Sequence, residues 1–213
     1  MIPPMPPSPR QVSLDDLAGS QLPHRGGPVT RWLARTVMRL AGWRMAGTLP
    51  DVPRLVMIAA PHTTNWDFPL GIVVMYAAGF RVNFLGKDTL FRPPLGWVMR
   101  WLGGRPVNRQ AAHGVVEESV RTIQQADRFI LALAPEGTRK RVSQWRTGFY
   151  RIAERAGLPI VLGYFDYPRK EVGFGPTLWA TGDLDRDLAE IQAFYRTKTG
   201  KYPENFATAT GES

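Results

Sequence analysis

The chain contains no cysteine among its 213 residues. This absence excludes disulfide bonds, thiolate nucleophiles and cysteine-ligated metal sites. Histidine is also scarce, and His24 and His113 do not have metal-ligand spacing with His62, so we expect no metal site. No apolar run reaches the roughly 18 residues that a membrane-spanning helix needs. The proline-rich start of the chain also has no apolar signal-peptide core.

Acidic residues are outnumbered, since 18 Asp and Glu stand against 27 Lys and Arg, giving a formal net charge of +9. Such an excess favours anionic partners, which include nucleic acid, anionic lipid headgroups and phosphate-rich carriers such as coenzyme A. The basic residues are not gathered into one tract and no nucleic-acid-binding signature occurs, so we expect no nucleic-acid partner. With 44% hydrophobic and 21% charged residues, the composition is typical of a globular domain with a sizeable core.

Apolar runs of strand length alternate with segments of helical length along most of the chain. The strands are expected at 54–60, 81–86, 129–134 and 159–165, and the helices at 66–79, 95–102, 110–126 and 147–157. This alternation predicts a single α/β domain with a mostly parallel central sheet flanked by helices. A further strand or hairpin is expected within 170–182, and a closing helix over 183–199.

The ends of the chain differ from this middle part. We expect a flexible, proline-rich arm over residues 1–28, one folded domain over 29–202, and a loose tail over 203–213.

Residues 30–44 carry apolar and basic side chains at helical spacing, which predicts an N-terminal amphipathic helix. Trp32 and Trp43 stand near its ends. The basic side is formed by Arg31, Arg35, Arg39 and Arg44. One interpretation is a helix at a membrane surface, and the other is a helix that packs its apolar side on the core. Both can hold for different flanks of one helix.

The most informative stretch runs from His62 to Asp67, between the strand at 54–60 and an apolar helix that follows. Because only Asp67 needs to be helical, the turn brings His62 within hydrogen-bond reach of the carboxylate. A carboxylate on one ring nitrogen fixes the tautomer and raises the basicity of the other, which makes a general base. A histidine beside an aspartate is also a common structural contact.

A second motif, residues 134–140 (APEGTRK), follows the apolar run 129–133. A glycine turn with exposed N–H groups, followed by a threonine, an arginine and a lysine, is well suited to hold a phosphate. The two motifs together predict a base and an anion clamp at the ends of neighbouring strands.

With both motifs in view, the chain resembles the glycerolipid acyltransferases, in particular the lysophospholipid (1-acylglycerol-3-phosphate) acyltransferase family. His62 and Asp67 match the H-x-x-x-x-D motif of that family. Residues 104–109 (GRPVNR) resemble its second block, which contacts the phosphate of the acceptor. Residues 135–139 match the third block, and 158–161 match the start of the fourth, near the acyl site. The four blocks occur in the family's order.

The sequence departs from the family pattern at a few positions around these blocks. They are Pro61, Thr64, Asn108, Ala134, Lys140 and Leu162. None removes the histidine, its carboxylate or the Glu-Gly turn. The departures cluster around the part of the site that is expected to bind the acceptor.

The resemblance implies an enzyme that moves a fatty acyl group from acyl-CoA or acyl carrier protein to a hydroxyl of a lysophospholipid such as 1-acylglycerol-3-phosphate. It implies no bound cofactor. His62 would be the base and Asp67 the residue that orients it, while the amide of Gly137 would help to stabilise the oxyanion.

Further residues are expected around the substrates. Those expected to bind them are Lys87, Arg105, Asn108, Arg109, Glu136, Gly137, Thr138 and Arg139. A solvated strand-end position is an equal alternative for Lys87. Acyl or membrane contacts are expected at Trp32, Trp97, Trp101 and Pro159, with ordinary core packing as the alternative for the residues around Trp97 and Trp101.

Two other functions stay open from the sequence. One is a thioesterase-like hydrolase that uses water in place of the acceptor, and the other is a catalytically degenerate basic module that binds membranes or nucleic acid. Glycerol-3-phosphate, an acylated amino acid and a glycolipid are alternative acceptors. Because the substrates are amphiphiles and no spanning segment is found, we expect a cytoplasmic protein bound peripherally to the anionic inner face of the cell membrane.

Overall fold

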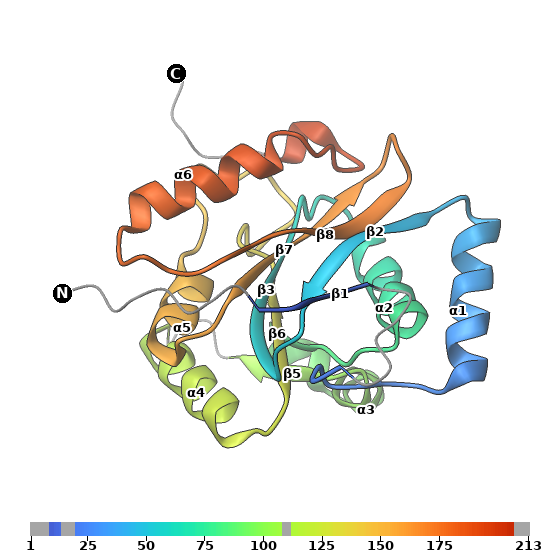
Figure 1. Ribbon diagram of the computed structural model, residues 1–213, viewed down its shortest axis with the longest axis horizontal. Helices are drawn as coiled ribbons and strands as arrows, with labels where there is room; N and C mark the ends of the chain where they lie inside the picture. The colour runs from blue at the N-terminus through green and yellow to red at the C-terminus, as the bar shows by residue number, and fades with distance from the viewer. Residues whose placement is uncertain (1–8, 14–19, 108–111, 207–213) are drawn as a thin grey trace.

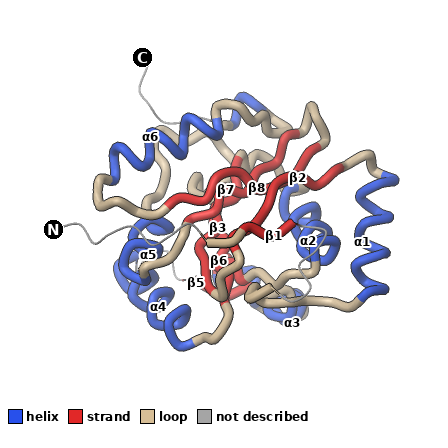
Figure 2. The backbone as a smooth tube through the Cα atoms, in the orientation of Figure 1, coloured by secondary structure: helices blue, strands red, loops and turns tan. Residues whose placement is uncertain are grey.

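The computed structural model describes residues 9–13, 20–107 and 112–206. In this part of the chain, eight strands form one sheet with helices on both faces (Figures 1 and 2). The strands are β1 (Gln11–Ser13), β2 (Arg44–Pro50), β3 (Arg54–Ala60), β4 (Asn83–Lys87), β5 (Gly104–Val107), β6 (Phe129–Leu133), β7 (Ile160–Asp166) and β8 (Glu171–Leu178). The helices are α1 (Pro28–Leu40), α2 (Asp67–Ala78), α3 (Leu95–Trp101), α4 (Ala112–Gln125), α5 (Gly148–Ala156) and α6 (Leu184–Tyr195), with 3-10 turns η1 (Asp88–Phe91) and η2 (Pro203–Asn205).

The strand order is β1-β2-β8-β7-β3-β6-β4-β5. Neighbouring strands are parallel, except for the antiparallel pairs β1–β2 and β7–β8. A mostly parallel sheet flanked by helices confirms the α/β fold expected from the sequence. β3 lies between β7 and β6, with Val56 opposite Ile160 on one side and Leu131 on the other. The carboxyl ends of β3 and β6 are therefore adjacent, so the two sequence motifs lie side by side.

Each face of the sheet has its own core. On one face, α4, α5 and α6 contribute buried side chains such as Ile123, Phe149 and Ile191. On the other face, α2 lies between the sheet and α1 (Figure 1), and the apolar cluster there contains Met38 of α1, Ala77 of α2 and Phe165 of β7. Because α2 has a neighbour on both sides, it is apolar over most of its circumference.

No helix in the described ranges combines the length and the apolar character that crossing a bilayer requires.

Three segments differ from the expectations. In the supposed flexible arm, β1 pairs with β2 and Leu22 is fully buried. The amphipathic helix ends at Leu40, because Arg44 already begins β2. In the supposed loose tail, η2 forms and Phe206 contacts Trp145. These short segments gain order from partners that are distant in sequence, which local periodicity does not reveal. Within these two ends, residues 1–8, 14–19 and 207–213 lie outside the described ranges.

Candidate active site

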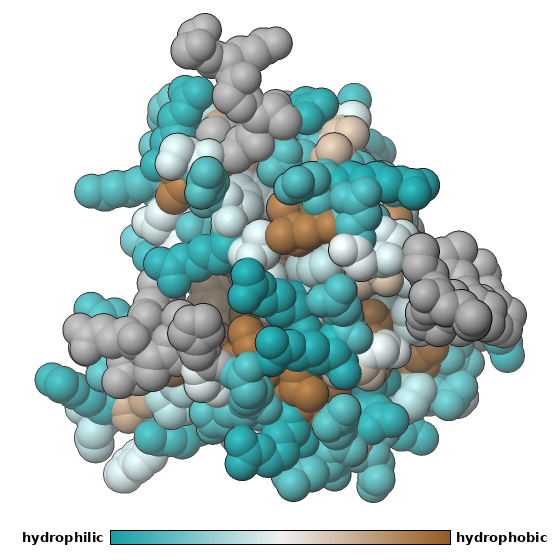
Figure 3. Space-filling view, turned by 90° about the vertical axis from the view of Figure 1, so that its left-hand side faces the viewer, coloured by the Kyte–Doolittle hydropathy of each residue, from teal (hydrophilic) through white to brown (hydrophobic). Residues whose placement is uncertain are grey.

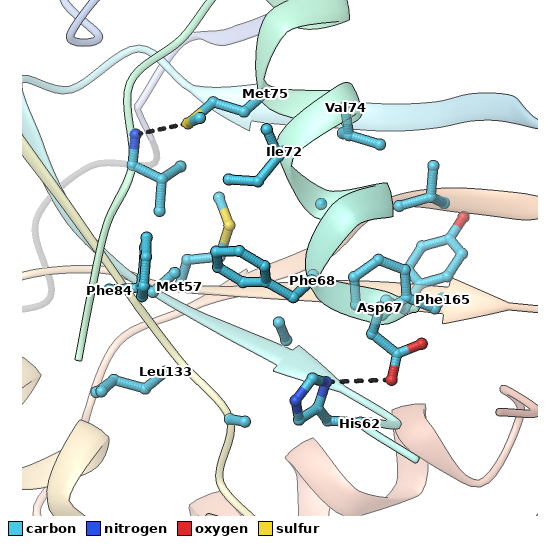
Figure 4. A pocket seen from close by; sticks show the side chains of 18 of the residues that line it. Met57, His62, Asp67, Phe68, Ile72, Val74, Met75, Phe84, Leu133 and Phe165 are labelled. Carbon is cyan, nitrogen blue, oxygen red and sulfur yellow. Dashed lines mark hydrogen bonds and ion pairs between the residues drawn. The ribbon is translucent and has the colours of Figure 1, made fainter. Parts of the chain in front are cut away.

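The turn between β3 and α2 brings His62 and Asp67 together. The Nδ1 atom of His62 lies 3.1 Å from Oδ2 of Asp67 (Figure 4). The Asp67 side chain is fully buried, whereas the His62 side chain is 20% exposed. With Nδ1 donating to the carboxylate, Nε2 is the ring nitrogen that can accept a proton. The proximity expected from the sequence is therefore present.

Two further donors hold the Asp67 carboxylate. The backbone N–H of Thr64 donates to Oδ2 at 3.0 Å, and the hydroxyl of Tyr167 donates to Oδ1 at 2.7 Å. Burial, and then the hydrogen bond to Asp67, raises the pKa of Tyr167, so this hydroxyl stays protonated and acts as a donor. Tyr167 belongs to none of the four sequence blocks, and nothing in its local sequence identified it.

Glu136 contacts the backbone of the same turn. Its Oε1 accepts the N–H of His62 at 2.9 Å. Its Oε2 is buried and has no hydrogen-bond partner among the described residues. Burial raises the pKa of Glu136, and the hydrogen bond from His62 partly offsets this effect. Glu136 was expected to bind substrate, but its observed contact is with the residue that carries the imidazole.

Gly137 takes a left-handed conformation with φ of 64°. Its N–H donates to the carbonyl of Ala134 at 3.1 Å. In this conformation the amide closes the turn, so it is not directed at an oxyanion as expected. A Cβ at this position would lie 2.7 Å from Nε of Arg146, which packs against the glycine. Arg146 is thus a basic neighbour of the turn that the motif analysis missed.

The polar and basic residues that were expected to bind the substrates do not all lie at the same end of the sheet. Lys87 is exposed at the carboxyl end of β4, and Thr138 and Arg139 are exposed beyond the carboxyl end of β6, on the edge that carries His62. The guanidinium of Arg105 instead lies 5.3 Å from the ring centre of Phe129, at the start of β6. The structure therefore does not bring Arg105 to the His62–Asp67 pair. Asn108 and Arg109 lie outside the described residues.

The loop after β6 is strongly basic. Residues 137–153 contain no acidic residue. Their first ten positions carry Arg139, Lys140, Arg141 and Arg146, all of them exposed. This unbalanced positive charge lies beside the turn of His62 and favours an anionic ligand there.

An apolar pocket of about 220 Å³ lies between α2 and the sheet. His62 and Asp67 lie at one end of it, whereas Met75 and Phe84 line it away from them (Figure 4). Its other apolar walls come from Met57, Phe68, Ile72, Val74, Phe80, Val82, Leu133, Phe165 and Phe174. The shape and lining suit a hydrocarbon chain whose reactive end reaches the imidazole.

The residues expected at acyl or membrane contacts do not line this pocket. Pro159 is buried at the amino end of β7, opposite the edge of His62, and its carbonyl accepts the N–H of Val56. Trp97 and Trp101 of α3 are 74% and 65% exposed, so neither is a core residue. Trp101 packs instead against the guanidinium of Arg25.

The amphipathic helix α1 is oriented with most of its large apolar side chains outward. Its inner stripe consists of Arg31, Ala34, Arg35 and Met38. Arg35 donates to the carbonyl of Ala77 at 2.9 Å, and Arg31 lies against Gly79, both at the carboxyl end of α2. The exposed large apolar residues are Val29, Trp32, Leu33, Val37 and Leu40. The interpretation in which the helix packs its apolar side on the core therefore does not hold for these five residues, whereas contact of the helix with a membrane stays a prediction.

The C-terminal segment covers the turn of His62. The N–H of Tyr202 donates to Oγ1 of Thr63 at 3.2 Å. Gly200 packs so closely on Thr63 that a Cβ there would lie 2.7 Å from the same Oγ1 atom. The turn is therefore supported by residues well beyond the four sequence blocks.

A metal site is not evident, because the described residues contain no cluster of three or more His, Asp or Glu side chains that could hold an ion.

A family model described as Acyltransferase matches residues 48–162, a range that contains all four sequence blocks. The crystal structure of the 1-acyl-sn-glycerophosphate (LPA) acyltransferase PlsC from Thermotoga maritima has a similar fold, with a TM-score of 0.55 and 16% sequence identity. The match covers 79% of this chain and 76% of that chain. A comparison with curated proteins found no match.

Proposed function

Because this chain belongs to the acyltransferase family and is an acyltransferase enzyme, we propose that it acylates a hydroxyl of a lysophospholipid such as 1-acylglycerol-3-phosphate. The acyl donor is a thioester of coenzyme A or of acyl carrier protein. The observation that carries this proposal is the His62–Asp67 pair at one end of an apolar pocket. A base that meets the reactive end of a bound hydrocarbon chain is what acyl transfer to a hydroxyl requires.

In the proposed reaction, Nε2 of His62 accepts the proton of the acceptor hydroxyl as its oxygen attacks the thioester carbonyl carbon. The tetrahedral intermediate then collapses, the carbon–sulfur bond breaks, and the imidazolium returns the proton to the leaving thiolate. Asp67 holds the ring and stabilises the imidazolium. The transfer is direct, with no acyl-enzyme intermediate.

The pocket between α2 and the sheet would hold the acyl chain, since its walls are apolar. The phosphate of the acceptor, or the phosphates of coenzyme A, would bind the basic loop after β6. We assign this role to Arg139 and Arg146, and the expected contribution of Asn108 and Arg109 stays a prediction. A guanidinium suits a phosphate because it donates two parallel hydrogen bonds.

We also propose a peripheral location on the inner face of the cell membrane. The outward side of α1 exposes Trp32 and Leu40, which are 64% and 84% exposed, and α3 exposes Trp97. The face of the molecule formed by α4, α5 and α6 is instead mostly hydrophilic (Figure 3). This asymmetry supports contact of α1 and α3 with a bilayer, where amphipathic tryptophan side chains are favoured.

The test measures thiol release from acyl-CoA, with and without acceptor. We expect release that depends on 1-acylglycerol-3-phosphate and is weaker with 1-monoacylglycerol, which keeps the hydroxyl at carbon 2 but carries a hydroxyl in place of the phosphate. The variant His62→Ala is the matched control for background release. Release that does not depend on any acceptor would identify a hydrolase and overturn the proposal. A parallel assay with acyl carrier protein as donor distinguishes the two carriers.

A further inference from the structure

We propose that Tyr167 is a positioning residue for acyl transfer, whose hydroxyl fixes the Asp67 carboxylate so that Asp67 holds the His62 imidazole in its reactive orientation. This inference rests on the proposed function, because it assigns Tyr167 a role in the same proton transfer. Tyr167 lies in the turn between β7 and β8, outside residues 48–162 that the family model matches.

The two oxygens of Asp67 have separate partners. Oδ2 receives the Thr64 N–H and lies 3.1 Å from His62 Nδ1, whereas Oδ1 accepts the Tyr167 hydroxyl at 2.7 Å. A carboxylate held at only one oxygen can rotate about its terminal torsion, which is broad and soft. The hydroxyl of Tyr167 therefore restricts a rotation that would move Oδ2 away from the imidazole.

Tyr167 is itself held from several directions. Its N–H donates to the carbonyl of Thr199 at 3.0 Å, and its own carbonyl accepts the N–H of Lys170 at 3.1 Å. Its ring packs edge-on against Trp43, with 5.0 Å between ring centres. A hydroxyl presented by such a fixed ring is a more restrictive donor than one on a mobile side chain.

Within the described residues, the contact that orients the His62 ring is the one between its Nδ1 atom and Asp67. Glu136, the other carboxylate in contact with this residue, accepts the backbone N–H of His62. Its hydrogen bond fixes the main chain of the turn. If the Asp67 carboxylate becomes mobile, the orientation of the His62 imidazole should therefore become less well defined.

The test uses Tyr167→Phe, which removes the hydroxyl and keeps the ring against Trp43. The matched control is Tyr150→Phe, because the Tyr150 hydroxyl also donates to a buried aspartate, Asp187, at 2.8 Å, between α5 and α6. We expect Tyr167→Phe to lower kcat about 10-fold, with KM for both substrates changed less than about twofold. We expect Tyr150→Phe to keep the wild-type kcat, even if both variants lose similar thermal stability.

A spectroscopic measurement separates positioning from general destabilisation. The chain has three histidines, so the ring nitrogens of His62 can be followed by NMR after labelling histidine with ¹⁵N. We expect the Nδ1–H tautomer of His62 to be dominant in the wild type and in Tyr150→Phe. Its population should fall in Tyr167→Phe. An unchanged tautomer population in Tyr167→Phe would overturn the proposal.

A double-mutant cycle completes the test. If Tyr167 acts through Asp67, adding Tyr167→Phe to Asp67→Asn should cause no further loss of kcat. An equal loss in both backgrounds, or wild-type kcat in Tyr167→Phe alone, would overturn the positioning role and leave the proposed function standing. Wild-type kcat in Asp67→Asn would instead overturn the assignment of the His62–Asp67 pair, and the role of Tyr167 with it.

Discussion

The two ends of α2 both carry buried or half-buried charge, but they use it differently. At the amino end, Asp67 places a fully buried carboxylate within reach of an imidazole beside an apolar pocket. At the carboxyl end, Arg35 of α1 donates to the carbonyl of Ala77. Both arrangements follow the helix dipole, which favours an anion at the first turn and a cation at the last.

The same electrostatic preference therefore supports catalysis at one end of α2 and the packing of α1 at the other. At the amino end, Asp67 contacts His62, a residue that can change its protonation state. At the carboxyl end, Arg35 donates to the carbonyl of Ala77 and Arg31 packs against Gly79, so the side of α1 that faces the domain carries these arginines and most of its large apolar side chains point outward. Two of the arginines on the basic side of the predicted helix, Arg31 and Arg35, therefore lie at the contact with α2.

The largest effect is expected at the amino end. His62→Ala should lower acyl transfer by about 10²–10⁴-fold, because the general base is lost. Asp67→Asn should lower it by about 10⁴-fold at most, because the tautomer of His62 is no longer held. Turnover with acyl-CoA and 1-acylglycerol-3-phosphate measures both, and circular dichroism checks that the fold is retained. Either variant keeping a tenth of wild-type turnover would refute the assignment.

The next effect concerns the outer side of α1. The double substitution Trp32→Ser and Leu40→Ser should weaken flotation with anionic liposomes at least about tenfold, because each large side chain contributes roughly 1.5–3 kcal/mol when buried. Activity on a detergent-dispersed acceptor should be unchanged. Arg39→Gln, on the same helix, is the matched control and should weaken flotation by only about 1 kcal/mol. Unaltered flotation of the double variant would show that α1 does not meet the bilayer.

A smaller effect is expected at the carboxyl end of α2. Arg35→Met should lower the free energy of unfolding by about 1–2 kcal/mol, because a charge-assisted hydrogen bond to a helix terminus is lost. Arg39→Met, an exposed position, should change it by less than about 0.5 kcal/mol. Urea unfolding followed by tryptophan fluorescence measures the difference. If Arg35→Met kept full stability but lost liposome binding, the two ends of α2 would not differ in the way described.

The smallest effect is expected at Glu136, beside the amino end. Burial raises the pKa of this carboxyl above its unfolded value. A group of this kind stabilises the folded state below its unfolded pKa, and this contribution is lost as the pH rises through its folded pKa. We therefore expect the midpoint of thermal unfolding, measured between about pH 5 and pH 8, to rise for Glu136→Gln relative to the wild type as the pH increases. Parallel pH profiles for the two proteins would contradict the prediction.

The sequence predicted the parts of the molecule that are encoded locally. The strand at 54–60 was predicted with its observed bounds, because an uninterrupted apolar run bounded by prolines is a strong signal. The proximity of His62 and Asp67 was also predicted, because the four residues between them form a turn in which only Asp67 needs to be helical. The adjacency of the two motifs followed from strand alternation.

Other features depend on contacts between distant segments. Tyr167 donates to Asp67 from 100 positions along the chain, and no local pattern marks it. The inward side of α1 stayed open in the sequence analysis, because periodicity identifies two sides of a helix without indicating which side the neighbour covers. Arg105 matched a family block, yet its guanidinium packs on Phe129 at the far end of β6.

The contact between Tyr202 and Thr63 joins residues 139 positions apart. Contacts of such separation form slowly, because a long loop must close before the contact stabilises it. The turn of His62 therefore gains this support only after the segment that follows α6 has closed such a loop, whereas the individual helices need contacts within a few residues only. In refolding experiments, the recovery of enzymatic activity should accordingly lag behind the recovery of helical circular dichroism, so that a protein with most of its secondary structure is still inactive.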